Sequence, residues 1–313
     1  IPIVLNGDTI TAENAGITVD GSKVTLTSAG TYSITGTLSD GQIIVDTDDK
    51  EVVRLVLSGV DIRNTTSAPI NIIKAEKTAI ELVENTENFI TDGETYVFET
   101  PDENEPNAAI FSKSDLTIFG SGSLAVNGNF NDGISSKDGL IIASGTISVN
   151  SVDDGIRGKD YVVIKDGNIT ISAQGDGLKS DNEEDTTKGF ISIDTGVINI
   201  SAGGDAITAQ TDVTVLGGEI ALTAGGGSDN QVDETVSAKG IKGIASVDIE
   251  SGTYTINSAD DAIHANGSIT INNGTFNIAS GDDGMHADTA LTINGGSIDV
   301  ANSYEGLESA VIT

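Results

Sequence analysis

Two consecutive stretches decide the fold: DAIHANGSITINNGTFNIASGD at residues 261–282 and DGMHADTALTINGGSIDVANSY at residues 283–304. Aligned without a gap, each begins with an acidic residue, has an apolar residue two positions later, and continues with runs of alternating apolar and polar residues. Alternation with a period of two indicates strands with one buried face, and a fixed repeat indicates a solenoid. The pair therefore predicts an all-β fold, a right-handed, single-stranded parallel β-helix with coils of about 22 residues.

The same register extends over most of the chain. An acidic or basic marker residue begins each coil at Asp132, Asp154, Asp176, Asp205, Lys239, Asp261, Asp283 and Glu305. A glycine before the last strand gives a second marker, at Gly145, Gly167, Gly196, Gly218, Gly252, Gly274 and Gly296. Both markers step by 22 residues except for one step of 29 and one of 34, so both locate insertions of 7 and 12 residues at the same points.

The repeat also sets the expected domain organisation. We expect a single β-helix domain over residues 1–313, with regular coils over 66–313 and irregular coils or a cap over 1–65, because the open end of a solenoid needs covering. Ile70-Asn71-Ile72 and Ala108-Ala109-Ile110 resemble degenerate earlier coils. The chain begins without Met and ends inside a strand pattern, so we expect a trimmed chain whose natural protein continues.

Composition excludes several classes of partner. The formal net charge of −33 repels nucleic acid and anionic membranes. No apolar run approaches the ~20 residues that span a bilayer, so we expect neither nucleic-acid binding nor membrane insertion. The absence of Cys excludes disulfides and thiol chemistry and is compatible with an extracellular protein. We expect a monomer.

Stacked coils place equivalent residues about 4.8 Å apart, so the marker residues form an acidic column. Residues just before the marker add further carboxylates at Asp153, Asp260 and Asp282. Three positions after the marker, a second column carries Ser135, Arg157, Lys179, Thr208, Lys242, His264, His286 and Glu308. Unit charges about 5 Å apart repel by roughly 3 kcal/mol at an effective dielectric of about 20, so the acidic column needs protons, cationic neighbours or metal.

Two interpretations of the columns remain open. In one, the columns are a ladder of ion pairs, or each Asp simply forms a turn, and both histidines belong to that ladder. In the other, which we favour, the carboxylates bind Ca²⁺, because hard oxygen ligands and the absence of Cys suit calcium better than zinc. The expected calcium ligands are Asp132, Asp153, Asp154, Asp176, Asp205, Asp260, Asp261, Asp282 and Asp283.

The two insertions fall within residues 180–188 and 225–236, next to the charged columns in the sequence. They either form the walls of a groove over these columns or are simply tolerated surface loops. The sequence contains no Ser-His-Asp or Cys-His constellation and no phosphate-binding glycine motif, and we assign no catalytic residue.

Three stretches carry a resemblance to a known family: DDGMHAD at 282–288, LTINGGSIDV at 291–300 and YSITGTLSDGQIIV at 32–45. They resemble the carbohydrate-binding domain-containing β-helix proteins of clostridia and their relatives. The resemblance covers essentially the whole chain. It implies a secreted protein of the bacterial cell surface that binds calcium, cellulose and acidic sugars such as polygalacturonate, on a fold shared with pectate lyases.

We favour calcium-dependent binding of plant cell-wall polysaccharide over catalysis. The candidate sugar-binding residues are the cations Arg157, Lys179, Lys239 and Lys242. One alternative is a polysaccharide lyase in which Ca²⁺ holds the uronate and Lys179 acts as base, with Arg157 assisting. A second alternative is a structural surface stalk or adhesin. With no Trp and only 12 Phe and Tyr residues, carboxylate–calcium bridging is favoured over ring stacking.

Overall fold

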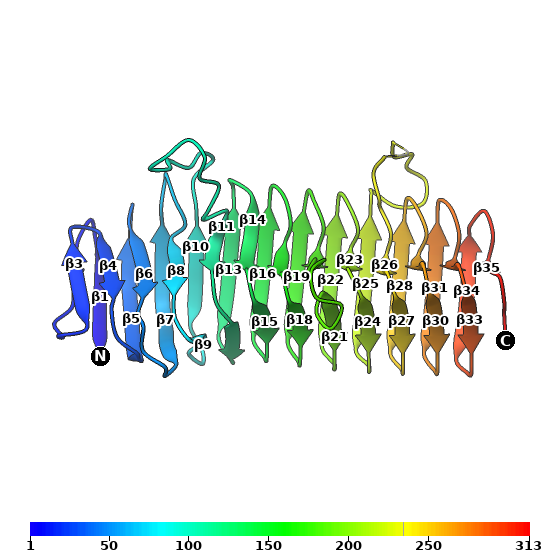
Figure 1. Ribbon diagram of the computed structural model, residues 1–313, viewed down its shortest axis with the longest axis horizontal. Coiled ribbons are helices and arrows are strands. Elements are labelled where there is room, and N and C mark those ends of the chain that lie inside the picture. Colours follow the sequence, from blue (N-terminus) through cyan, green and yellow to red (C-terminus); the bar gives the residue numbers. More distant parts are fainter. Residues whose placement is uncertain (234) are drawn as a thin grey trace. The chain divides into compact units, whose positions relative to one another are not determined.

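The chain is all-β, as predicted, and its strands stack as a parallel β-helix (Figure 1). The computed structural model describes every residue except Glu234, which falls within the predicted insertion 225–236. None of the residues so described lies in a helix, and none therefore in one that is long and apolar enough to cross a membrane. Two compact units make up the chain, an N-terminal unit, Ile1–Gly158, and a C-terminal unit, Lys159–Thr313.

The C-terminal unit stacks its strands in three parallel columns. The first column contains β20 (Leu178–Ser180), β23 (Ile207–Ala209), β26 (Ile241–Gly243), β29 (Ile263–Ala265), β32 (Met285–Ala287) and β35 (Leu307–Ser309). The second contains β18 (Tyr161–Ile164), β21 (Phe190–Ile193), β24 (Asp212–Val215), β27 (Ser246–Ile249), β30 (Ser268–Ile271) and β33 (Ala290–Ile293). The third contains β19 (Asn168–Ala173), β22 (Val197–Ala202), β25 (Glu219–Ala224), β28 (Thr253–Ser258), β31 (Thr275–Ser280) and β34 (Ser297–Asn302).

Between successive coils of this unit the strand pairing follows the predicted register, with one irregularity in the last pair of the third column, where Ala279 pairs with Asn302. Ile263 pairs with Met285, the residue 22 positions later, and Leu178 pairs with Ile207 across the first insertion. Along β22 exposed and buried residues alternate, because successive side chains of a strand point to opposite faces. Tyr254 and Phe276 both point inward and stack with ring centroids 4.5 Å apart.

The glycine marker has a steric cause. At Gly218 the backbone has a φ of +114°, which residues with a Cβ rarely adopt. A Cβ there would also lie 2.8 Å from the carbonyl oxygen of Gly196 in the preceding coil. The turn into the third column therefore selects glycine once per coil.

The N-terminal unit has the same plan with a less regular beginning. It contains β1 (Pro2–Gly7), β2 (Ile10–Thr11), β3 (Ile17–Asp20), β4 (Lys23–Leu26), β5 (Gly30–Leu38), β6 (Gln42–Asp46), β7 (Val53–Arg63), β8 (Ile70–Lys74), β9 (Thr78–Leu82), β10 (Glu87–Thr91), β11 (Ala108–Ser112), β12 (Leu116–Gly120), β13 (Ser123–Gly128), β14 (Asp132–Ser136), β15 (Gly139–Ile142), β16 (Thr146–Ser151) and β17 (Ile156–Gly158). Strands β1–β2 and β3–β4 pair antiparallel, whereas the later pairs are parallel. Ile70 and Ile110 share a register with Ile134, which confirms the two degenerate coils.

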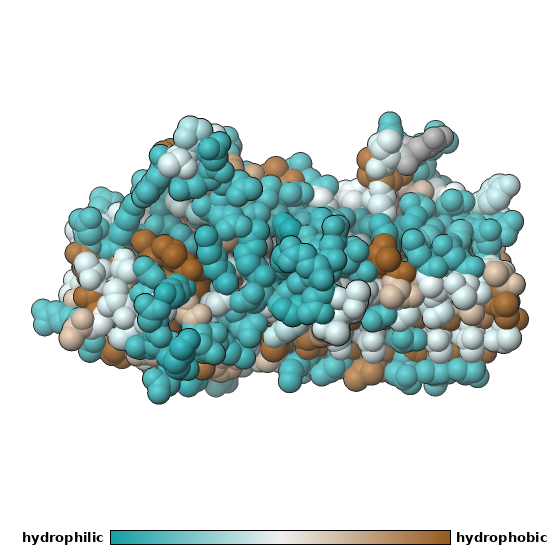
Figure 2. All heavy atoms as spheres, in the orientation of Figure 1, coloured by the Kyte–Doolittle hydropathy of each residue, from teal (hydrophilic) through white to brown (hydrophobic). Residues whose placement is uncertain are grey.

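Both insertions leave the stacked strands undisturbed. Residues 181–188 follow β20, and residues 225–233 follow β25 and project as part of the loop drawn in yellow (Figure 1). In the space-filling view the first insertion forms a raised hydrophilic patch (Figure 2). Asn182 anchors this loop by donating from its side-chain amide to a carboxylate oxygen of Asp160, at 2.6 Å.

Candidate functional site: a charged groove between two insertions

In the C-terminal unit, the carboxylates of the acidic column form hydrogen bonds from one coil to the next. One carboxylate oxygen of each marker Asp accepts the backbone N–H of the next marker residue. With the donor named first, these hydrogen bonds join Asp205 to Asp176 (2.8 Å), Lys239 to Asp205 (2.8 Å), Asp283 to Asp261 (3.0 Å) and Glu305 to Asp283 (3.0 Å). The carboxylates thereby satisfy backbone donors that a turn would otherwise leave unpaired.

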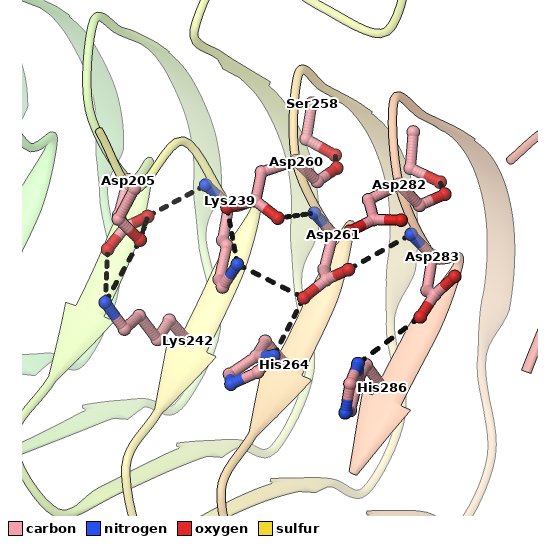
Figure 3. Close-up of polar contacts among 12 residues, drawn as sticks. Asp205, Lys239, Lys242, Ser258, Asp260, Asp261, His264, Asp282, Asp283 and His286 are labelled. Carbon is pink, nitrogen blue, oxygen red and sulfur yellow. Dashed lines mark hydrogen bonds and ion pairs between the residues drawn. The ribbon is translucent and has the colours of Figure 1, made fainter. Parts of the chain in front are cut away.

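The other oxygen of each marker Asp faces the cationic column, as Figure 3 shows for Asp205, Asp261 and Asp283. Oδ2 of Asp176 lies 2.8 Å from Nζ of Lys179, and the same atom of Asp205 lies 3.2 Å from Nζ of Lys242. In the following coils the partners are imidazoles, with His264 Nδ1 2.8 Å from Asp261 and His286 Nδ1 3.3 Å from Asp283. The ladder of ion pairs that the sequence suggested is therefore present along this unit.

Lys239 occupies a marker position, and its ammonium compensates the charge of two carboxylates in the coil that follows. Nζ lies 2.5 Å from Oδ2 of Asp260 and 3.2 Å from Oδ2 of Asp261. Burial alone would lower the pKa of Lys239, but the charges of Asp261 and Asp260 outweigh burial and raise it. Burial would likewise raise the pKa of Asp261, yet the bonds from His264 and Lys239 lower it to about 2.

A groove of about 510 Å³ lies over the middle of these columns. Its floor includes the Asp176–Lys179 and Asp205–Lys242 pairs. Its lining includes Ser180, Asp181 and Glu183 from around the first insertion, and Val236 and Ser237 from around the second. Both insertions therefore contribute to its walls. The described residues that line it include no aromatic side chain.

Some lining residues are not apparent from the repeat. The hydroxyl of Ser237 donates to Asp205 at 2.7 Å and lies 3.0 Å from Nζ of Lys242. Asp181 and Glu183 bring two further carboxylates to the groove. Asp181 and Glu183 belong to the first insertion, and Ser237 directly follows the second, so the 22-residue register gives little information about the direction of these side chains.

In the N-terminal unit, three predicted calcium ligands come together. Carboxylate oxygens of Asp132, Asp153 and Asp154 lie within 4.8 Å of one another. Asp132 is fully buried, and burial together with the charge of Asp154 raises its pKa to about 7. Nη1 of Arg157 lies 3.9 Å from Asp132 and compensates this charge in part. Clustered oxygens with a surplus of negative charge fit the coordination chemistry of Ca²⁺.

A second trio, Asp260, Asp261 and Asp282, also brings its oxygens within 4.8 Å, but Lys239 already lies against two of them. A calcium ion there would have to compete with this ammonium. The remaining predicted ligands, Asp176, Asp205 and Asp283, each have one oxygen bonded to a neighbouring coil and the other facing a side chain of the cationic column.

The predicted sugar-binding cations occupy different places. Lys179 and Lys242 line the groove. Lys239 is turned towards Asp260 and Asp261, with its side chain 12% exposed. Arg157 belongs to the N-terminal unit, beside Asp132.

Comparisons with known proteins give a consistent assignment. A sequence model of a family described as carbohydrate-binding domain-containing protein matches residues 20–284. A protein of that description from Acetivibrio thermocellus is 47% identical over 150 residues, which are 48% of this chain and 52% of the relative. The matched region thus spans about half the length of that relative.

Among solved structures, a polysaccharide lyase-like protein from C. thermocellum, studied as a gadolinium derivative, is similar over the whole chain. The TM-score is 0.62 and the sequence identity 32%, covering 100% of this chain and 98% of that one.

Proposed function

The chain belongs to the family of carbohydrate-binding domain-containing proteins, and from this premise we propose that it binds acidic, polygalacturonate-type polysaccharide in a calcium-dependent manner. The observation that carries the proposal is the groove between the two insertions, in which carboxylates and lysines alternate. We further propose that the protein acts outside the cell, at the bacterial surface, as a binding module rather than a lyase.

Charge explains the need for a bridging ion. A chain with a net charge of −33 repels a polyanion. The groove lysines offer limited relief, because Lys179 and Lys242 already face Asp176 and Asp205. A divalent cation held by groove carboxylates, and completed by the carboxylate of a sugar, converts this repulsion into attraction.

The trio of Asp132, Asp153 and Asp154 supports a structural calcium ion in the N-terminal unit. Its oxygens converge around a buried carboxylate that needs a positive partner. Calcium here would stabilise the coils without contacting the sugar.

Cellulose is a second candidate ligand, favoured by a hollow of about 690 Å³ in the N-terminal unit. Val97, Phe98 and Ile73 supply apolar surface there, while Gln42 and Asn71 supply amides. A neutral glucan presents apolar ring faces and hydroxyl groups, which match such a lining.

The lyase alternative requires an unprotonated base. The ammonium of Lys179 lies 2.8 Å from Asp176, and an ion pair of this kind favours the protonated form. This contact is the reason for preferring binding over elimination.

A pull-down on polygalacturonate beads tests the proposal, with calcium or EDTA present and with absorbance of unsaturated product followed in parallel. We expect calcium-dependent retention without product, and weaker retention for Lys179→Ala and Lys242→Ala. Lys165→Ala is the matched control, because the exposed Lys165 lies outside the groove lining and outside both insertions.

Retention that persists in EDTA contradicts calcium bridging. Product that disappears in Lys179→Ala identifies a lyase instead. No retention on polygalacturonate or cellulose under either condition leaves the structural stalk as the better account.

A further inference from the structure

His264 and His286 each lie against the marker Asp of their own coil (Figure 3), but the rest of their surroundings differs. Nδ1 of His264 lies 2.8 Å from Asp261, an ordinary hydrogen bond, and its Nε2 lies 3.1 Å from the amide oxygen of Asn266. His286 instead meets three carboxylates, with Nδ1 3.3 Å from both Asp283 and Glu308 and Nε2 3.2 Å from Asp288.

A neutral imidazole at His286 cannot donate a hydrogen bond to all three carboxylates. A neutral imidazole carries one N–H. If Nε2 donates to Asp288, then Nδ1 turns a lone pair towards the oxygens of Asp283 and Glu308. Three acceptors facing one point repel one another unless a cation lies between them.

We propose that Asp283, His286 and Glu308 form a binding site for a borderline divalent cation such as Zn²⁺, with Asp288 as the positioning residue that fixes the imidazole. Ligand atoms of all three lie within 4.8 Å of one another. Bonds of about 2.0–2.1 Å in a tetrahedral site place neighbouring ligand atoms about 3.3 Å apart. Both separations from Nδ1 of His286 equal that length, 3.3 Å.

The donor set separates this site from the calcium sites proposed above. An imidazole nitrogen is a common ligand of zinc and an unsuitable one for calcium, which takes oxygen ligands. Asp288 beyond Nε2 reproduces the carboxylate–histidine–metal arrangement that orients such ligands.

Access from solvent is open. A hollow of about 410 Å³ lies against His286, Asp288 and Glu308. It provides room for a water molecule or a group of a ligand in the fourth position. Asp283 is almost fully buried and is fixed from the other side by the backbone N–H of Glu305, so the site has one rigid ligand and two more accessible ones.

Calorimetric titration of the whole chain with zinc chloride, in the presence of excess calcium, tests the proposal. We expect one zinc equivalent that calcium does not displace. Affinity should fall by at least about tenfold in His286→Gln and in Glu308→Gln, and by about tenfold in Asp288→Asn. The matched control is His264→Gln, which should bind zinc as the unchanged protein does.

Cobalt(II) provides a second readout, because a tetrahedral site with a nitrogen ligand gives visible absorption that His286→Gln should abolish. Circular dichroism establishes that each variant is folded, and the exposed Glu308 keeps the test informative should His286→Gln not fold. Zinc binding that is absent, or unchanged in both His286→Gln and Glu308→Gln, overturns the site and leaves His286 as a member of the ion-pair ladder. An equal loss in His264→Gln moves the metal to the histidine pair and likewise overturns the three-residue site.

Discussion

Both carboxylate trios consist of three Asp residues, but the pKa of the buried Asp is raised in one trio and lowered in the other. In Asp132–Asp153–Asp154, the buried member has its pKa raised to about 7 by burial and by Asp154. In Asp260–Asp261–Asp282, the buried Asp261 has its pKa lowered to about 2, because His264 and Lys239 outweigh burial. One ammonium group at the preceding marker position makes much of the difference. A repeated carboxylate is thus charged or protonated according to its neighbour.

The largest effect is expected when the ammonium group of Lys239 is removed. Lys239→Met leaves Asp260 and Asp261 without their lysine partner in a half-buried setting, with the Lys239 side chain 12% exposed. We expect the free energy of unfolding in EDTA to fall by about 3 kcal/mol, as for a buried pair that loses one member. Urea unfolding measures the change, and added calcium should restore most of it. A loss below about 1 kcal/mol would contradict this account of Lys239.

The second change acts on the other trio. Calcium that binds only the folded chain stabilises it, by about 2.7 kcal/mol at a hundredfold excess over the dissociation constant. In Asp132→Asn this gain should disappear, because the central carboxylate is lost. Melting temperatures with calcium and with EDTA measure the gain. Asp260→Asn is the control and should keep it; an unchanged gain in Asp132→Asn excludes this calcium site.

A third buried carboxylate, Asp92, should make the stability of the fold depend on pH. It is held by the backbone N–H of Asn129 and the hydroxyl of Tyr96, and burial raises its pKa to about 6. A carboxyl group with a raised folded-state pKa stabilises the fold at low pH, and this contribution is lost as pH rises through that value. Between pH 4 and pH 7 the chain should therefore lose up to about 3 kcal/mol relative to Asp92→Asn.

Unfolding by urea at several pH values, with Asp92→Asn measured beside the unchanged chain, provides the test for Asp92. Parallel pH curves for the two proteins would show that folding leaves the pKa of Asp92 unshifted and would contradict this account.

The smallest effect is expected at an exposed ion pair. Lys50 and Glu76 lie 3.2 Å apart, with side chains 85% and 54% exposed. Lys50→Met should change the free energy of unfolding by less than about 0.5 kcal/mol, because water screens such pairs. Measured in the same urea series, it shows how much of the Lys239→Met effect comes from burial.

The sequence predicts the coil and its columns because both depend on a periodic requirement. Each inward position needs an apolar residue, and each turn with a positive φ needs glycine, so Ile263 and Gly218 can be placed from spacing alone. The first coils are harder, because β5 and β7 each run through what later becomes two shorter strands. There the period is hidden although the alternation persists.

Which residue neutralises which carboxylate could not be predicted. Lys239 shares the marker register with Asp205 and Asp261, yet its long side chain reaches forward to the next coil. His264 and His286 are equivalent in sequence, but only His286 also faces Glu308 and Asp288. These differences depend on side-chain reach and on positions where the residue type varies from coil to coil, such as Ser237 at the groove.

The bond from each marker carboxylate to the next backbone N–H spans 22 residues between Asp261 and Asp283, but 29 between Asp176 and Asp205 and 34 between Asp205 and Lys239. Its length is 2.8 Å across both insertions. The scaffold therefore tolerates a change of loop length without a change of pitch. Loops at these two points could be exchanged, lengthened or shortened to alter which ligand the surface accepts, while the stack beneath keeps its geometry.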